Sequence, residues 1–116
     1  MFDHVGIRVS DRDASERFYE TVLSTLGIEQ THNDDELVEW DELAVGDDGP
    51  ATSRLHMGFR AAGHAEVDAF WQAGIDAGYR DDGAPGPRPQ YVEDYYGAYV
   101  LDPDGNNVEV VNHNRG

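Results

Sequence analysis

The stretch DHVGIRV at residues 3–9 decides the fold, because it recurs as LHMGFRA at residues 55–61, 52 positions later. His, Gly and Arg coincide in the two copies, and the residues between them are apolar in both. The same shift, without a gap, places the aromatic pair 18–19 over the pair 70–71. We interpret the chain as a single domain, 1–116, built from two copies of one module at about 1–50 and 54–116.

Each copy begins with a strand and continues with a helix. Apolar residues alternate with His, Gly and Arg in the opening stretch, so the two kinds of side chain lie on opposite faces of a strand. An apolar stripe at 18–26 then predicts a helix that Ser10 caps and Gly27 ends. A stripe at 67–75 predicts the second helix, which ends at Gly78.

Short strands are expected to complete each module. Gly and Pro residues are frequent at 81–94, which predicts a loop with little regular structure and at most a weak strand within 80–91. The remaining strands are expected at 28–32, 37–40, 42–45, 96–101 and 107–111.

The predicted fold is therefore α+β. It consists of two repeated βαβββ modules, whose mixed sheets form a curved cleft with the helices outside. The helices would cover the apolar strand faces, so the faces that carry His, Gly and Arg would line the cleft. Polar residues on an inner face are the main functional signal in the sequence.

Composition excludes several classes of protein. The chain has 24 acidic and 8 basic residues, a net charge of −16, so we expect it to bind neither nucleic acid nor an anionic membrane. It has no Cys, which excludes disulfides and a thiol nucleophile. Its first residues show no signal-peptide pattern and no segment could span a bilayer, so we expect a cytoplasmic protein.

Three side chains suggest a metal site. His4 and His56 are equivalent in the two modules, and pseudo-twofold symmetry would bring them to one cleft. Glu109 stands between two valines near the end of the chain, so it would enter the cleft if the valines pack on the helix. Two imidazoles and one carboxylate suit a divalent cation with open positions. Glu42, at the end of the first module, is a possible fourth ligand, although its acidic surroundings favour a solvated face.

Other polar residues allow two interpretations. Arg8 and Arg60 either balance acidic neighbours or hold anionic groups of a substrate. His32, His64 and His113 have no symmetric partner and are expected at the surface, although His113 lies on the Glu109 side of its strand.

Three segments resemble a known family. They are residues 3–11 (DHVGIRVSD), the aromatic pair 18–19 before Leu26-Gly27, and the closing hairpin 95–109 (YYGAYVLDPDGNNVE). The chain is similar in these segments to the vicinal oxygen chelate superfamily, which includes glyoxalase I, bleomycin-resistance proteins, extradiol dioxygenases and fosfomycin-resistance enzymes.

The resemblance implies paired βαβββ modules and a homodimer. It implies a divalent metal (Zn, Ni, Mn, Fe or Co) held by His4, His56 and Glu109, with Glu42 as a possible fourth ligand as in glyoxalase I. It also implies that Tyr99, three residues before the Asp-Pro-Asp-Gly turn, contacts the substrate.

The expected function is that of a glyoxalase I-like lyase or an extradiol-type dioxygenase. The metal would hold two oxygens of a small substrate, with Glu109 and Tyr99 at the reacting centre. Lyase, isomerase and ring-cleaving chemistry stay open at this point. The alternatives are a non-catalytic protein that binds a small molecule or drug, as bleomycin-resistance proteins do, and a purely structural dimer module.

Overall fold

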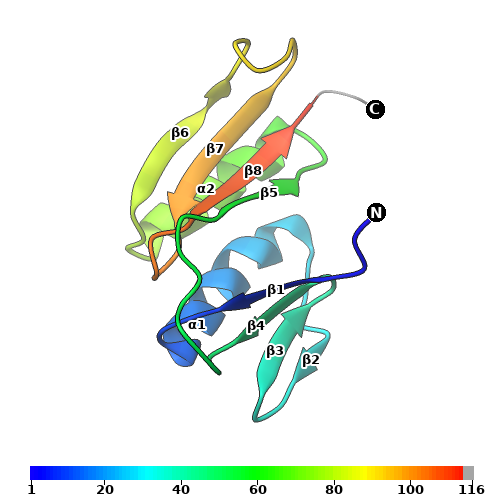
Figure 1. Cartoon of the computed structure of the whole chain (residues 1–116). Coiled ribbons are helices and arrows are strands. Elements are labelled where there is room, and N and C mark those ends of the chain that lie inside the picture. The colour runs from blue at the N-terminus through cyan, green and yellow to red at the C-terminus, as the bar shows by residue number, and fades with distance from the viewer. Residues whose placement is uncertain (114–116) are drawn as a thin grey trace.

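The computed structural model describes residues 1–113, which form two four-stranded sheets and two long helices (Figure 1). Residues 114–116, at the end of the second predicted module, lie outside the described part. In chain order the elements are β1 (Val5–Arg8), α1 (Arg12–Leu23), the 3₁₀ turn η1 (Ser24–Leu26), β2 (His32–Asn33), β3 (Leu37–Trp40), β4 (Leu43–Gly46), β5 (His56–Arg60), α2 (His64–Asp76), β6 (Asp81–Pro87), β7 (Tyr96–Leu101) and β8 (Asn107–Asn112). This order confirms the predicted α+β fold and the internal repeat.

Both sheets have the same strand order. The first is β1-β4-β3-β2 and the second is β5-β8-β7-β6, so the opening strand of each module lies at a sheet edge. In each sheet the opening strand pairs in parallel with the last strand of its module, and all other neighbours are antiparallel. The two sheets lie one beyond the other along the molecule and are not closed into one barrel (Figure 1).

The helices cover the apolar faces of the sheets and contact each other. One continuous core runs through both modules and includes Phe18, Val45, Phe70 and Val108, all completely buried. Gly74 of α2 permits this packing, because a Cβ there would lie only 3.2 Å from the side chain of Val100 in β7.

The turn between β7 and β8 joins the two modules. The buried carboxylate of Asp102 accepts a hydrogen bond from the Tyr19 hydroxyl of α1 at 2.8 Å, and others from the backbone amides of Asp104 and Asn106. Burial and the adjacent Asp102 carboxylate raise the pKa of Tyr19 well above its ordinary value. Asp104 in turn accepts hydrogen bonds from the backbone and hydroxyl of Ser10. A turn of the second module is thus bonded to the first.

The predicted Ser10 cap of the first helix is wrong. Asp11 is the N-cap residue, and its side chain accepts a hydrogen bond from the Ala14 amide at 3.0 Å. A carboxylate at this position also interacts favourably with the positive end of the helix dipole. The helix stops are confirmed, since Gly27 and Gly78 have φ values of +74° and +93°.

The segment expected to be irregular, 81–94, contains a seven-residue strand, β6. Its prolines, Pro85 and Pro87, are tolerated because β6 is the outer strand of its sheet and has one neighbour. The pairing with β7 contains two register shifts, the first between Asp81 and Gly83. In contrast, the strand expected at 28–32 shrinks to His32–Asn33. Gln30 instead donates a hydrogen bond to Glu16 of α1, so this residue contacts the helix and does not pair in a sheet.

Candidate functional site

A pocket of about 550 Å³ lies on the polar face of the second sheet. Residues from β5, β6, β7, β8 and the loop after β6 line it: His56, Asp82, Tyr91, Tyr95, Tyr99, Asn107 and Glu109. Strand alternation explains its chemistry, because Val108 and Val110 point into the core while Glu109 between them points into the pocket. The predicted orientation of Glu109 is therefore confirmed.

Glu109 is the most buried polar group of this pocket, with 3% of its surface exposed. In register it lies opposite Gly58 of β5 and Tyr99 of β7. A Cβ at Gly58 would lie 3.6 Å from Glu109 Oε1, and a Cβ at Gly97 would lie 3.2 Å from Oε2. The contact at Gly58 would be ordinary van der Waals contact, whereas a side chain at Gly97 would crowd the carboxylate, so the glycine at 97 leaves room for Glu109.

Both carboxylate oxygens of Glu109 have partners. His56 Nε2 lies 2.9 Å from Oε1, and the Tyr95 hydroxyl donates a hydrogen bond to Oε2. A buried carboxylate requires such partners, since leaving it unpaired would cost several kcal/mol. The pocket therefore presents an imidazole nitrogen and a carboxylate oxygen side by side.

The other ring nitrogen of His56 is also held. Nδ1 lies 2.6 Å from Oδ1 of Asn107, and Nδ2 of Asn107 donates a hydrogen bond to Asp82 at 2.5 Å. The polar side chains form one connected series across the sheet, from Asp82 through Asn107, His56 and Glu109 to Tyr95.

Three tyrosines form the aromatic wall of the pocket. Burial, together with a hydrogen bond to Tyr91, raises the pKa of Tyr99 to about 12. Burial and the bond to Glu109 raise the pKa of Tyr95 even further. Both hydroxyls therefore keep their protons at neutral pH and act as hydrogen-bond donors. His113 packs edge-on against Tyr95, and its Nδ1 is buried without a hydrogen-bond partner among the described residues.

His4 does not join this pocket within one chain. Its side chain is 65% exposed, and its Nδ1 bonds to Asp3 at 2.8 Å. Among residues 1–113, no three His, Asp or Glu side chains are placed to hold one metal ion. The expectation that pseudo-symmetry brings His4 and His56 into one cleft of the same chain is wrong, because the two sheets lie beside each other and do not face each other.

Glu42 does not occupy the position equivalent to Glu109. Gly58 pairs with Glu109 in the second sheet, whereas the equivalent Gly6 pairs with Ala44 in the first. Ala44, two residues after Glu42, is therefore the residue equivalent to Glu109. Glu42 instead lines a separate pocket beside Met57.

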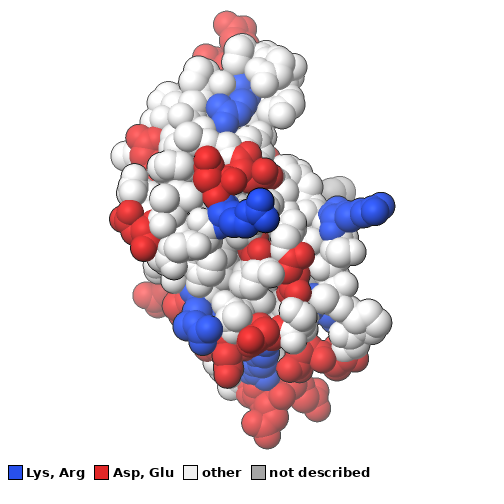
Figure 2. All heavy atoms as spheres, turned by 90° about the vertical axis from the view of Figure 1, so that its left-hand side faces the viewer, with Lys and Arg blue, Asp and Glu red and all other residues white. Residues whose placement is uncertain are grey.

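The two arginines considered for substrate binding lie elsewhere. Arg8 forms an ion pair with Asp48 at 3.0 Å and lines a pocket on the first sheet. Arg60 lines the pocket that contains Glu42. Arg88 instead contacts the tyrosine wall, with its guanidinium carbon 5.4 Å from the centre of the Tyr99 ring. Figure 2 shows that carboxylates spread over the face it displays, with arginines scattered among them.

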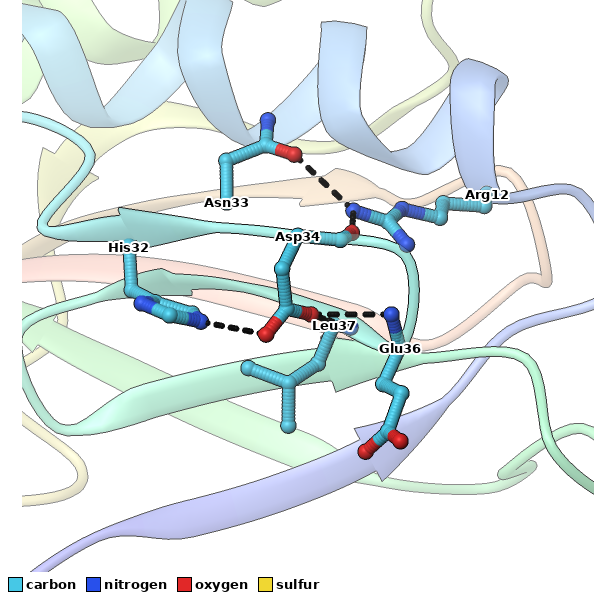
Figure 3. A network of polar contacts seen from close by, with 6 residues as sticks. All are labelled: Arg12, His32, Asn33, Asp34, Glu36 and Leu37. Carbon is cyan, nitrogen blue, oxygen red and sulfur yellow. Dashed lines mark hydrogen bonds and ion pairs between the residues drawn. The ribbon is translucent and has the colours of Figure 1, made fainter.

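A second His–carboxylate pair lies far from the pocket, at the β2–β3 turn (Figure 3). His32 Nε2 lies 2.7 Å from Asp34, whose other oxygen accepts the backbone amides of Glu36 and Leu37. These amides and His32 lower the pKa of Asp34 to about 2, and the bond to Asp34 raises the pKa of His32. About half of each side chain is exposed, so this pair organises a turn at the surface. The predicted surface position of His32 is therefore confirmed.

Tyr95, Asn107 and Asp82 line the pocket but were not among the predicted site residues. The alternation of residues 95, 97 and 99 could have revealed Tyr95, which directly precedes β7, because Tyr99 pairs with Glu109 on the same face. Asn107 lies directly opposite His56 in the parallel register, which only the strand pairing reveals.

Fold and pocket together define a paired βαβββ protein whose polar sheet face carries an imidazole–carboxylate pair. The chain belongs to the Glyoxalase/Bleomycin resistance protein/Dioxygenase superfamily, whose family model matches residues 1–110. This confirms the family resemblance found in the sequence. A search of curated proteins gives no match. Neither helix of the described chain is long and apolar enough to cross a membrane.

Solved structures support the assignment. A glyoxalase/bleomycin resistance protein from Albidiferax ferrireducens T118 is 32% identical, with a TM-score of 0.83 over 97% of this chain and 98% of that one. A lactoylglutathione lyase from Agrobacterium tumefaciens is 25% identical, with a TM-score of 0.73 over 97% and 92%. Oxidase ChaP-H2 shares the fold, with 21% identity and a TM-score of 0.68 over 97% and 92%.

Proposed function

We propose that this protein is a metal-dependent enzyme that binds a small oxygen-bearing substrate on a divalent cation held by His56 and Glu109. The observation that carries the proposal is the pairing of His56 Nε2 with a buried carboxylate oxygen 2.9 Å away, on the floor of a pocket. A bound cation would act as a Lewis acid that polarises the substrate oxygens.

The donor pair fits such a cation. Two ligands that each lie about 2.1 Å from one ion, at a right angle, are themselves about 3.0 Å apart. His56 Nε2 and Glu109 Oε1 have nearly this separation, at 2.9 Å. Imidazole and carboxylate donors suit Zn, Ni, Mn, Fe and Co.

The third ligand is proposed to be His4 of a second copy of the chain. Asp3 holds Nδ1 of His4, so Nε2 is the nitrogen available to a metal. Met1, Phe2 and Val5 beside His4 are exposed apolar residues that an interface could cover. A twofold dimer would use the same contact twice and so complete two identical sites.

The ligand set is proposed to have three members and no fourth. The position in the first module equivalent to Glu109 carries Ala44, which has no donor atom. Two histidines and one carboxylate leave several coordination positions open. This favours a substrate that supplies two neighbouring oxygens, as an α-hydroxycarbonyl compound or a catechol does.

The chain's own groups would then orient the substrate. Tyr99 lines the pocket, and its protonated hydroxyl could exchange its hydrogen bond with Tyr91 for one to a substrate oxygen. Tyr95 holds Glu109 in place through its hydroxyl. The proposal covers both lyase or isomerase chemistry and ring-cleaving oxygenation.

Elemental analysis tests the proposal. Protein loaded with Mn, Fe, Ni, Co or Zn and then freed of excess metal is expected to retain about one ion per chain, and His56→Ala is expected to fall to background. His64→Ala, at the start of α2, is the control. Turnover of methylglyoxal hemithioacetal and of catechols then separates the reaction classes. Equal metal content in wild type and His56→Ala would contradict the proposal.

A second candidate function is non-catalytic binding of a cationic or aromatic small molecule. Glu109 is already satisfied by His56 and Tyr95, and the pocket combines a tyrosine wall with acidic residues. Cations bind favourably to aromatic faces and carboxylates. Ligand affinity that is unchanged by a chelator would support this function, whereas affinity lost with the metal would support the enzyme.

A further inference from the structure

We propose that Tyr91 determines which substrates the pocket accepts, by stacking its ring on a flat aromatic substrate and thereby releasing the Tyr99 hydroxyl. The inference rests on the proposed function, since it names the shape of substrate that the same pocket prefers. Its evidence is the different way in which the three tyrosines of the pocket wall are held.

Two of the three tyrosines are fixed in the wall. Tyr95 donates its hydroxyl hydrogen to Glu109, the buried carboxylate of the pocket floor. Tyr99 lies within β7 and pairs with Glu109 of the neighbouring strand. Moving Tyr99 would disturb the sheet, and moving Tyr95 would remove a partner of the buried carboxylate.

Tyr91 is held much less firmly. It lies on the loop between β6 and β7, where every residue of 89–94 is exposed. The Tyr91 side chain lines the pocket, yet 58% of the residue's surface is exposed. Its ring meets Tyr95 edge-on, with centroids 5.1 Å apart, and its hydroxyl shares a hydrogen bond with Tyr99. An edge-on contact leaves at least one face of the Tyr91 ring uncovered, and such a face can stack on another ring.

The loop that carries Tyr91 has a fixed base and an exposed tip. At the base, the backbone amide of Arg88 donates a hydrogen bond to the carbonyl of Tyr95 at 2.7 Å. The Arg88 side chain donates another to the carbonyl of Ala84 at 2.8 Å, and its guanidinium lies over the Tyr99 ring. A tip without buried side chains costs little free energy to move. Tyr91 can therefore shift while the base keeps it at the pocket.

In the structure, Tyr91 occupies the hydroxyl that a substrate oxygen needs. The hydrogen bond between Tyr91 and Tyr99 has to break before Tyr99 can bond to the substrate. A flat aromatic substrate compensates for this loss, because stacking on the Tyr91 ring favours its binding about 2- to 10-fold. An aliphatic substrate with the same two oxygens has no such compensation. The pocket therefore discriminates by the shape of the substrate.

Titration calorimetry with two uncharged probes tests the inference. Catechol is flat and aromatic, whereas hydroxyacetone offers two neighbouring oxygens without a ring. In Tyr91→Ala, the ratio of the affinities for catechol and hydroxyacetone should fall about 2- to 10-fold. In Tyr91→Phe, the ring remains, so the ratio should not change. This variant should bind both probes at least as tightly as wild type, because its Tyr99 hydroxyl is already released.

The matched control is Val92→Ala, which shortens the next exposed side chain of the same loop and should leave the ratio unchanged. Metal content should be equal in all variants, because His56 and Glu109 keep their partners. An unchanged ratio in Tyr91→Ala, an equal fall in Val92→Ala, or weaker binding of both probes by Tyr91→Phe would overturn the inference.

NMR of ring-labelled tyrosine separates this inference from the proposed function. If wild type binds no metal, the proposed function fails. In that case, catechol is still expected to shift the Tyr91 ring signals of the metal-free protein, and hydroxyacetone is not. Tyr91 signals that catechol leaves in place would overturn the inference.

Discussion

The two modules share one backbone plan but differ in what their polar faces carry. In the second sheet, Glu109 lies between Gly58 and Tyr99. The equivalent position in the first sheet holds Ala44, between Gly6 and Glu39. The pockets on the two faces have similar volumes, about 550 Å³ each. The repeat therefore supplies a scaffold twice, whereas the buried donor group is present in one half.

His56–Glu109 of the second module and His32–Asp34 of the first differ in burial. The His56–Glu109 and His32–Asp34 contacts have similar lengths, 2.9 and 2.7 Å. Glu109 has 4% of its side chain exposed, against 49% for Asp34. Water screens the exposed pair and keeps it weak, while the buried carboxylate depends on its partners. Distance alone thus does not mark a functional pair.

The largest effect is expected at the turn through which the second module holds the first. Asp102→Ala leaves the Tyr19 hydroxyl and the amides of Asp104 and Asn106 without their acceptor. It should therefore lower the free energy of unfolding by about 3 kcal/mol or more. Tyr19→Phe should cost about 1–2 kcal/mol. Chemical denaturation measures both changes. The control is Asp41→Asn in the β3–β4 turn, where the side chain is exposed, so the free energy of unfolding should change little. Equal stability of Asp102→Ala and wild type would show that the modules do not depend on this turn.

A smaller effect is expected at the exposed pair of the first module. Asp34 has a lowered pKa, so its contribution to stability is present above about pH 4 and is lost as the pH falls towards about 2. His32 has a raised pKa, so its contribution is complete below about pH 6.5 and is lost as the pH rises through the folded value. Both contributions are therefore present together between about pH 4 and 6.5.

Asp34→Asn checks this window. The pKa of His32, measured by NMR, should return towards its ordinary value in the variant. The difference in melting temperature from wild type should be small, and smaller still above pH 7. A His32 pKa that does not change would show that Asp34 is not its partner.

No effect on metal binding is expected at Glu42. In the strand register, Ala44 and not Glu42 occupies the position equivalent to Glu109. Glu42→Gln should therefore leave the metal affinity and the reaction rate unchanged. Isothermal titration with the metal that wild type retains measures this. A clear loss of metal affinity would show that Glu42 is a metal ligand. The two modules would then be more alike than their strand registers indicate.

The sequence predicted local features well because short-range patterns encode them. Alternation located β3 and β7 at their observed bounds and gave the direction of Glu109. The repeat predicted the common topology of the two sheets. These features depend on neighbours within a strand or a helix, so residue order suffices.

Features that depend on contacts between segments were not predictable in the same way. The position of His4 relative to His56 follows from how the modules join, through side chains such as Tyr19 and Asp102 that are 83 residues apart. The place of Asp82 in the pocket depends on a bulge in β6, which shifts the register by one residue. No periodic pattern records either feature.

The outer edges of the two sheets have a consequence for solubility at high concentration. β2 has two residues, and β6 carries Pro85 and Pro87 as well as its register shifts. Short, proline-bearing or bulged edges offer few free N–H groups to an incoming strand. Fibril growth by strand addition at these ends is therefore disfavoured, even in a molecule whose secondary structure is mostly extended.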